Sequence, residues 1–80
     1  MPTVLRQDGY RFYFYSHEPN EPPHVHVDKG GASAKVWLEN VALARNMGYK
    51  PRELPGILEI VRANRERLWE AWHGHFGTSG

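Results

Sequence analysis

The segment 24–38 constrains the fold more than any other part of the chain, because its pattern predicts its own pairing. Polar and apolar residues alternate on both sides of Gly30 and Gly31, as they do in half-buried strands joined by a two-residue turn. The pairs that this turn predicts are Lys29–Ala32, Asp28–Ser33, Val27–Ala34, His26–Lys35, Val25–Val36 and His24–Trp37. A shift by one residue would move every side chain to the opposite face, so the register is strongly specified.

The two faces of this hairpin differ in chemistry. One face collects small and branched apolar residues, namely Val25, Val27, Ala34 and Val36. The opposite face carries His24, His26, Asp28, Ser33, Lys35 and Trp37. Antiparallel sheets commonly bury one face and leave the other for solvent or ligands. We therefore expect the apolar face to form the core and the polar face to carry any chemistry.

Other strands are expected before and after this hairpin. The segment 4–15 is typical of a strand, a tight turn at Asp8 and Gly9, and a second strand. The segment 16–23 contains three prolines and is expected to form no regular element. The segment 39–49 is compatible with either a short strand or a helical turn.

The segment 51–76 is predicted to be helical, because its apolar residues recur about every 3.6 positions. The apolar stripe consists of Leu54, Ile57, Leu58, Val61, Leu68, Trp69, Trp72 and Phe76. Pro51 suits the first helical position, whereas Pro55 does not suit an interior one. Either a short turn precedes a helix that begins near Pro55, or the first helical turn is distorted.

Together these elements predict an α+β fold with about four antiparallel strands in two hairpins and one long C-terminal helix packed on one face. Residues 1–76 are expected to form one domain, followed by a flexible tail over 77–80. An exposed edge strand and surface aromatics favour a homodimer or a heterodimer.

Composition narrows the classes of function. The 80 residues suffice for one domain, and the absence of cysteine excludes disulfide scaffolds, thiolate metal sites and cysteine nucleophiles. Ten Lys and Arg against nine Asp and Glu give a net charge of +1, so no strong global field attracts nucleic acid. No apolar run approaches a membrane span, and the N-terminus lacks the apolar core of an export signal. We therefore expect a cytoplasmic protein with no membrane partner.

The histidines are the main candidates for chemistry. His17, His24 and His26 lie within ten residues, and the last two share a strand face. With Lys35 beside His26, His24 and His26 supply what a metal-independent ribonuclease needs: an acid, a base and a cation to stabilise phosphate charge. The alternative is that these residues are solvent-facing strand positions with no chemical role.

Arg65 is the second unusual residue, because it falls near the centre of the apolar helical stripe. Either its stem packs on Trp69 or Trp72 while the guanidinium stays in water, or it lies at a functional cleft or a partner interface. In the second case Arg65 would join Lys35 in stabilising phosphate charge.

Two other kinds of site are compatible with the sequence. No cofactor is expected, but His24 and His26 could hold a divalent metal with a third ligand, for which the candidates are His17, Asp28 and Glu21. Aromatic side chains on strands can stack on nucleic acid bases or contact a partner, and basic neighbours strengthen such a surface. The residues proposed for this surface are Tyr13, Tyr15, Trp37 and Arg62.

Several segments are similar to the signature of a small bacterial family, the domain of unknown function numbered four-one-six-zero. They are the opening Pro2–Leu5, the strand Gly9–Ser16, the segment Glu21–Val27 with its Pro-Pro-His-Val-His core, Ala34–Leu38, and Asn64–Glu66 followed by Trp72. The resemblance implies a gene beside a small partner, as in toxin–antitoxin pairs. It further implies growth arrest through blocked translation, dependent on the segment that contains His24 and His26.

The leading hypothesis is therefore a toxin-like component of a type II toxin–antitoxin module that acts on RNA or the translation machinery. Its catalytic residues would be His24, His26, Lys35 and Arg65, and its partner a cognate small antitoxin-like protein. The alternative is a non-catalytic binding module, the antitoxin or regulatory half of such a pair, which binds protein or DNA.

Overall fold

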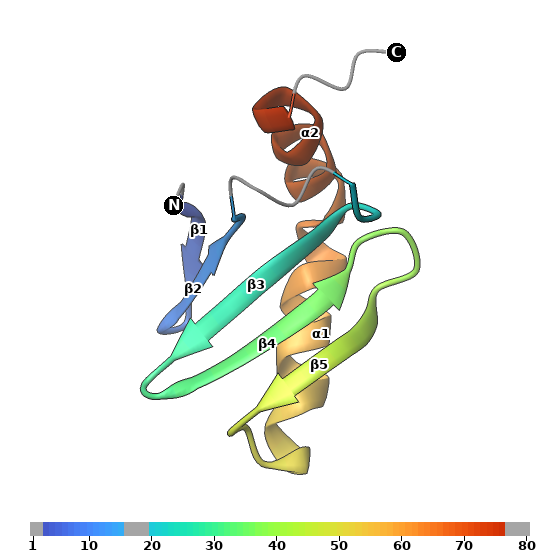
Figure 1. The fold of residues 1–80 in the computed structure, drawn as a ribbon. Helices are drawn as coiled ribbons and strands as arrows, with labels where there is room; N and C mark the ends of the chain where they lie inside the picture. Colours follow the sequence, from blue (N-terminus) through green and yellow to red (C-terminus); the bar gives the residue numbers. More distant parts are fainter. Residues whose placement is uncertain (1–2, 16–19, 77–80) are drawn as a thin grey trace.

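The computed structural model describes residues 3–15 and 20–76, without the side chain of residue 76. The expected tail over 77–80 and the candidate ligand His17 lie outside the described residues. The described chain forms one antiparallel sheet and two α-helices (Figure 1).

The sheet contains five strands in the order β1-β2-β3-β4-β5, so each strand pairs with its neighbour in sequence. The strands are β1 (Thr3–Gln7), β2 (Tyr10–Tyr13), β3 (His24–Lys29), β4 (Ala32–Trp37) and β5 (Ala42–Met47). The two turn signals in the sequence, Asp8-Gly9 and Gly30-Gly31, each join two neighbouring antiparallel strands.

The central hairpin has the predicted register. All six pairs from Lys29–Ala32 to His24–Trp37 are present. Gly30 has a φ of 57°, whereas Gly31 does not have a positive φ, as in a type II′ turn. The first hairpin is also confirmed, and both of its turn residues, Asp8 and Gly9, have positive φ values, of 54° and 85°.

The expectation of four strands was wrong, because the ambiguous segment 39–49 contributes the fifth. β5 pairs with β4 from Ser33–Met47 to Trp37–Ala42, with a bulge opposite Lys35 and Val36. The run Val-Ala-Leu-Ala has no decisive local preference, so the free edge of β4 decides its conformation.

The expectation of one long helix was also wrong, because the helical segment is divided. It consists of a 3₁₀ turn η1 (Pro51–Glu53), helix α1 (Leu54–Ala63) and helix α2 (Arg65–Phe76). Pro55 lies in the first turn of α1, so the short turn before the helix is the correct alternative.

Asn64 separates the two helices. Its φ of −112° and ψ of 14° are not helical, and its side-chain amide donates to the Ile60 carbonyl at 2.8 Å and to Gln7 Oε1 at 3.2 Å. The Ile60 carbonyl also accepts from the Asn64 backbone N–H at 3.1 Å, so the side chain adds a second bond there and ties the break to β1. Helix α2 then resumes with the Leu68 amide donating to the Asn64 carbonyl at 2.9 Å.

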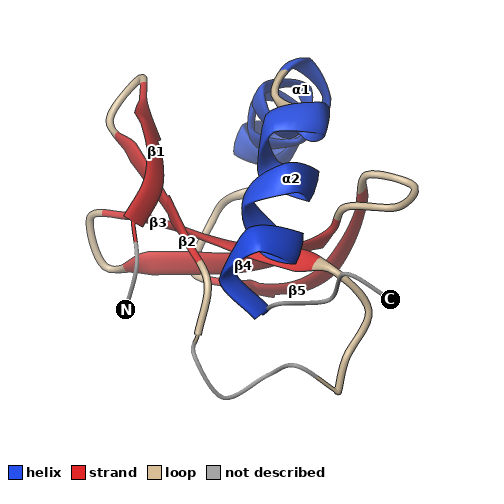
Figure 2. Cartoon of the chain, turned by 90° about the horizontal axis from the view of Figure 1, so that it is seen from above, coloured by secondary structure: helices blue, strands red, loops and turns tan. Residues whose placement is uncertain are grey.

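Both helices lie on the same side of the sheet (Figure 2), and the core fills the space between these layers. The fully enclosed members are Phe12, Phe14, Val25, Val27, Val36, Leu38, Ile57, Val61 and Leu68. The predicted core face of the central hairpin is therefore confirmed. None of the described helices covers the opposite face of the sheet, which we call the open face (Figure 2).

Candidate functional site

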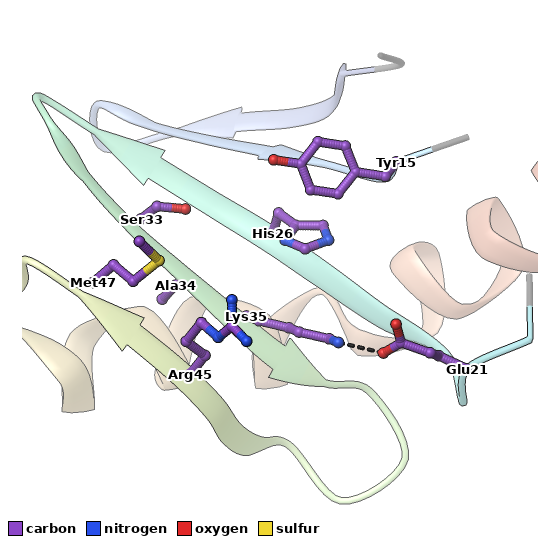
Figure 3. A pocket seen from close by; sticks show the side chains of 8 residues that line it. All are labelled: Tyr15, Glu21, His26, Ser33, Ala34, Lys35, Arg45 and Met47. Atoms are coloured by element: carbon purple, nitrogen blue, oxygen red, sulfur yellow. Dashed lines mark hydrogen bonds and ion pairs between the residues drawn. The ribbon is translucent and has the colours of Figure 1, made fainter. Parts of the chain in front are cut away.

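The open face carries a pocket of about 230 Å³ (Figure 3). Its lining residues are Tyr15, Glu21, His26, Ser33, Ala34, Lys35, Arg45 and Met47. We call this the open-face pocket. It brings together an imidazole, two cations, a carboxylate and two hydroxyl groups in one small space.

Strand register places these groups. Tyr13 pairs with His26, His26 with Lys35, and Lys35 with Arg45, so one row of side chains crosses β2, β3, β4 and β5. Residues paired directly across antiparallel strands project on the same face. The row therefore depends on the pairing of four strands and not on any single motif.

His26 lies at the back of the pocket and is enclosed by aromatic rings. It is 8% exposed, stacks on Tyr13 with ring centroids 5.4 Å apart, and meets the edge of Tyr15 at 4.3 Å. These ring contacts restrict the movement of the imidazole, which lines the pocket. A fixed imidazole with limited access to water is suited to proton transfer.

Tyr13 supports His26 from the side of β2. Its hydroxyl donates to Asp28 Oδ1 at 2.9 Å, and the Arg11 guanidinium lies 4.5 Å from its ring centroid. Burial raises the pKa of Tyr13, and hydrogen bonds with Tyr15 and Asp28 raise it further. Tyr13 therefore stays protonated and holds a fixed position, so it belongs to the wall behind the pocket.

His24 occupies a different environment from His26, although their rings are 5.1 Å apart. It is completely buried, and the Trp72 ring lies 4.8 Å from its own. Its Nδ1 lies 2.9 Å from the Pro22 carbonyl, which can only accept, so Nδ1 carries the proton. The structure thus places His24 behind His26 and outside the pocket lining.

Lys35 lines the pocket and points toward Glu21 (Figure 3). Its ammonium group forms an ion pair with Glu21 Oε1 and lies 4.8 Å from the Trp37 ring centroid. Trp37 itself packs edge-on against His24 and does not line the pocket. Glu21 precedes the two prolines that lead into β3, which directs its carboxylate toward Lys35 (Figure 3).

Arg65 does not line the open-face pocket. It donates through Nε to the Leu38 carbonyl at 2.7 Å and through Nη2 to the Glu39 carbonyl at 3.0 Å. Its guanidinium lies 5.0 Å from the Trp69 ring centroid, so the same group contacts that ring and holds the two carbonyl groups that follow β4. Arg62 is exposed on α1 and pairs with Glu59, also away from the pocket.

The candidate metal ligands are not gathered into a site in the described part of the chain. No group of three His, Asp or Glu side chains there is arranged to hold a metal ion. Asp28 accepts from Tyr13, and Glu21 pairs with Lys35. His17 lies outside the described residues.

Sequence reasoning missed Arg45 and assigned Glu21 only as a metal ligand. Arg45 lies on β5 and pairs with Lys35. The local sequence pattern of segment 39–49 does not predict this strand, so it does not predict that Arg45 lies beside Lys35. For Glu21 a signal existed, because a carboxylate just before a rigid Pro-Pro step must lie near the start of β3.

The fold and the pocket define a small α+β protein with a polar site on the uncovered face of an antiparallel sheet. Residues 9–73 match the model of the family described as Domain of unknown function (DUF4160), and the chain belongs to this family. It has no significant match among curated proteins or among solved structures. None of the described helices is both long and apolar enough to cross a membrane.

Proposed function

We propose that this protein is a cytoplasmic toxin-like component of a bacterial type II toxin–antitoxin module, which inhibits translation by cleaving RNA in the open-face pocket without a metal. The observation that carries the proposal is the convergence of His26, Glu21, Lys35 and Arg45 on one pocket. Metal-independent cleavage of RNA needs a base, an acid and cations near the phosphate. This set contains all of them.

Each group has a role that its position supports. Lys35 and Arg45, neighbours across β4 and β5, bind the non-bridging oxygens of the scissile phosphate. Phosphate binding draws Lys35 away from Glu21, and the freed carboxylate serves as the base. His26, held by the tyrosine rings, serves as the acid.

The reaction is an internal transfer that needs no co-reactant. Glu21 takes the proton of the ribose 2′-hydroxyl, and the 2′-oxygen forms a bond to phosphorus. The bond from phosphorus to the 5′-oxygen breaks, and His26 gives that leaving oxygen a proton. The products are a 2′,3′-cyclic phosphate and a 5′-hydroxyl, and the pentavalent charge that develops between them is stabilised by Lys35 and Arg45.

His24 and Arg65 have other roles in this scheme. His24 is completely buried, so it acts as a positioning residue that packs beside His26. Arg65 fixes the carbonyl groups at the end of β4, the strand that carries Lys35. Both residues keep the site in shape without touching the substrate.

The charge of the open face answers the objection that the whole chain is nearly neutral. Four cations project from the open face, namely Arg6, Arg11, Lys35 and Arg45. The described acids beside them are Asp28, which is hydrogen-bonded to Tyr13, and Glu21, which is paired with Lys35. A local excess of positive charge is sufficient to attract a polyanion such as RNA.

The test is to incubate the purified protein with a short single-stranded RNA that contains all four bases, with and without a chelator. We expect chelator-resistant cleavage and a 2′,3′-cyclic phosphate detected by mass spectrometry. His26→Gln and Lys35→Gln should each reduce the rate by about 100-fold. Arg62→Gln is the matched control, because Arg62 is exposed on α1 away from the pocket, and this variant should keep most of the activity.

The same variants are then expressed in growing cells without a partner. The natural chain should arrest growth, and His26→Gln should relieve the arrest while retaining the thermal unfolding midpoint. If the RNA stays intact and growth is normal, the ribonuclease proposal is wrong and the non-catalytic binding module stands. If cleavage survives both pocket substitutions, the reaction takes place elsewhere.

A further inference from the structure

Strand β5 is an edge strand of the sheet, and it carries exposed apolar side chains. It pairs with β4 on one side only, and no described residue pairs with its other side. The two exposed large hydrophobic residues among the described residues both belong to it: Leu43 at 36% and Met47 at 59%. Natural proteins usually protect such edges with charges, prolines, bulges or short strands.

The protection of β5 is incomplete. The strand is six residues long, equal to β3 and β4, and contains no proline. Its protective features are the bulge opposite Lys35 and Val36 and the single charge of Arg45. The opposite edge differs, because the apolar residues of β1, Val4 and Leu5, pack against the core.

Arg45 indicates the charge of what would cover this edge. It is exposed, and no hydrogen bond or ion pair joins it to another residue in the described part of the chain. Met47 lies two positions along on the same face, since both pair with open-face residues of β4, Lys35 and Ser33. An extended segment beside β5 would therefore meet a free cation and an apolar side chain on one face.

We propose that β5 binds an extended segment of another protein by strand addition, and that this segment places an acidic residue opposite Arg45 and an apolar residue opposite Met47. Backbone hydrogen bonds to the free edge supply affinity, and the two alternating side chains supply specificity. Arg45 and Met47 also line the open-face pocket, so a bound segment lies along the rim of that pocket. The proposal concerns binding alone and does not require that the pocket cleave RNA.

The probe is a synthetic heptapeptide, Thr-Val-Thr-Glu-Thr-Val-Thr with blocked ends, in which an acidic residue has an apolar residue two positions away on each side. Binding to the isotope-labelled protein is followed by the amide chemical shifts. We expect the largest shifts along β5, and an affinity roughly ten-fold higher than for the same peptide with Lys in place of Glu. Arg45→Glu should reverse this preference.

Arg67→Glu is the matched control, because Arg67 is exposed on α2 and should leave the preference unchanged. The amide spectrum of each variant also shows whether it is folded. The proposal is overturned by any of three results: no shift at about 1 mM peptide, equal affinity for the Glu and Lys peptides, or shifts confined to another surface. Concentration-dependent shifts of β5 without peptide would instead identify a second copy of this chain as the occupant.

Discussion

The two faces of the sheet contain similar numbers of aromatic side chains but use them differently. On the helix-covered face Phe12 and Phe14 are fully buried against apolar neighbours, and Phe14 meets Trp72 edge-on at 5.3 Å. On the open face Tyr13 and Tyr15 enclose His26. These residues alternate along one stretch of chain, so strand alternation alone sends one pair to the core and the other to the site.

The comparison explains how so small a protein can build a pocket. A chain of 80 residues cannot bury a deep cavity, because its core is barely sufficient for folding. Here the helix-covered face supplies the stability, while the open face is free to hold charged groups that would be costly in the core. Substitutions on the two faces should therefore have separable effects.

The largest expected effect is the difference in stability between substitutions at two adjacent residues that lie on opposite faces of the sheet. Phe12→Ala should lower the free energy of unfolding by about 3–5 kcal/mol, because it leaves a cavity in a tightly packed core. Arg11→Ala removes a contact with the Tyr13 ring and a hydrogen bond to Thr3 Oγ1, and should cost about 1 kcal/mol. Urea unfolding measures both free energies. Similar losses of stability for the two variants would show that the helix-covered face does not supply most of the stability.

The pH dependence of stability, which one buried tyrosine on each face should control, is an effect of intermediate size. Burial raises the pKa of Tyr49, whose hydroxyl donates to the Val27 carbonyl at 2.9 Å, to about 12, and the pKa of Tyr13 is also raised. Because the folded state favours the neutral phenol, their stabilising effect is complete below about pH 10 and is lost as the pH rises toward 12.

For Tyr49 the loss should reach about 2 kcal/mol. Thermal unfolding between about pH 9 and 12 measures this slope. Tyr49→Phe and Tyr13→Phe should each flatten it in part, and the double variant should flatten it most. A slope that persists in the double variant would mean that other groups control the alkaline transition.

The smallest expected effect is a gain in stability from a substitution in helix α1. A Cβ on Gly56 would meet no atom within 4 Å, and this glycine lies in α1. Gly56→Ala should therefore stabilise the protein by about 0.5–1 kcal/mol, because the unfolded chain loses more freedom than the folded one. The proposed RNA cleavage should stay unchanged, and a loss of cleavage would place part of the site on the helix layer.

Local signals were sufficient for the hairpins. The Gly30-Gly31 turn and the alternation around it specified six pairs, and with them the position of His26 beside Lys35. They were insufficient for β5 and for the helix break. A run such as Val41–Ala44 has no strong intrinsic preference, and Asn64 ends α1 with the help of a side chain, Gln7, that is distant in sequence.

The candidate site was predicted in part for the same reason. The sequence identified His26 and Lys35, because both lie on the hairpin whose register it specified. It also selected His24 and Arg65, which the tertiary structure places outside the pocket lining. Helical phase correctly indicated that Arg65 faces inward, but not that its partners are the carbonyl groups of Leu38 and Glu39.

The sequence by itself determined the α+β class, the central register and the division of the hairpin into an apolar and a polar face, because turn chemistry and alternation act over a few residues. Only the tertiary structure decided which side chains share a pocket. Trp72 from α2 packs against His24, and Arg45 from β5 extends the row begun by His26. Such contacts join residues far apart in the chain, and no local pattern encodes them.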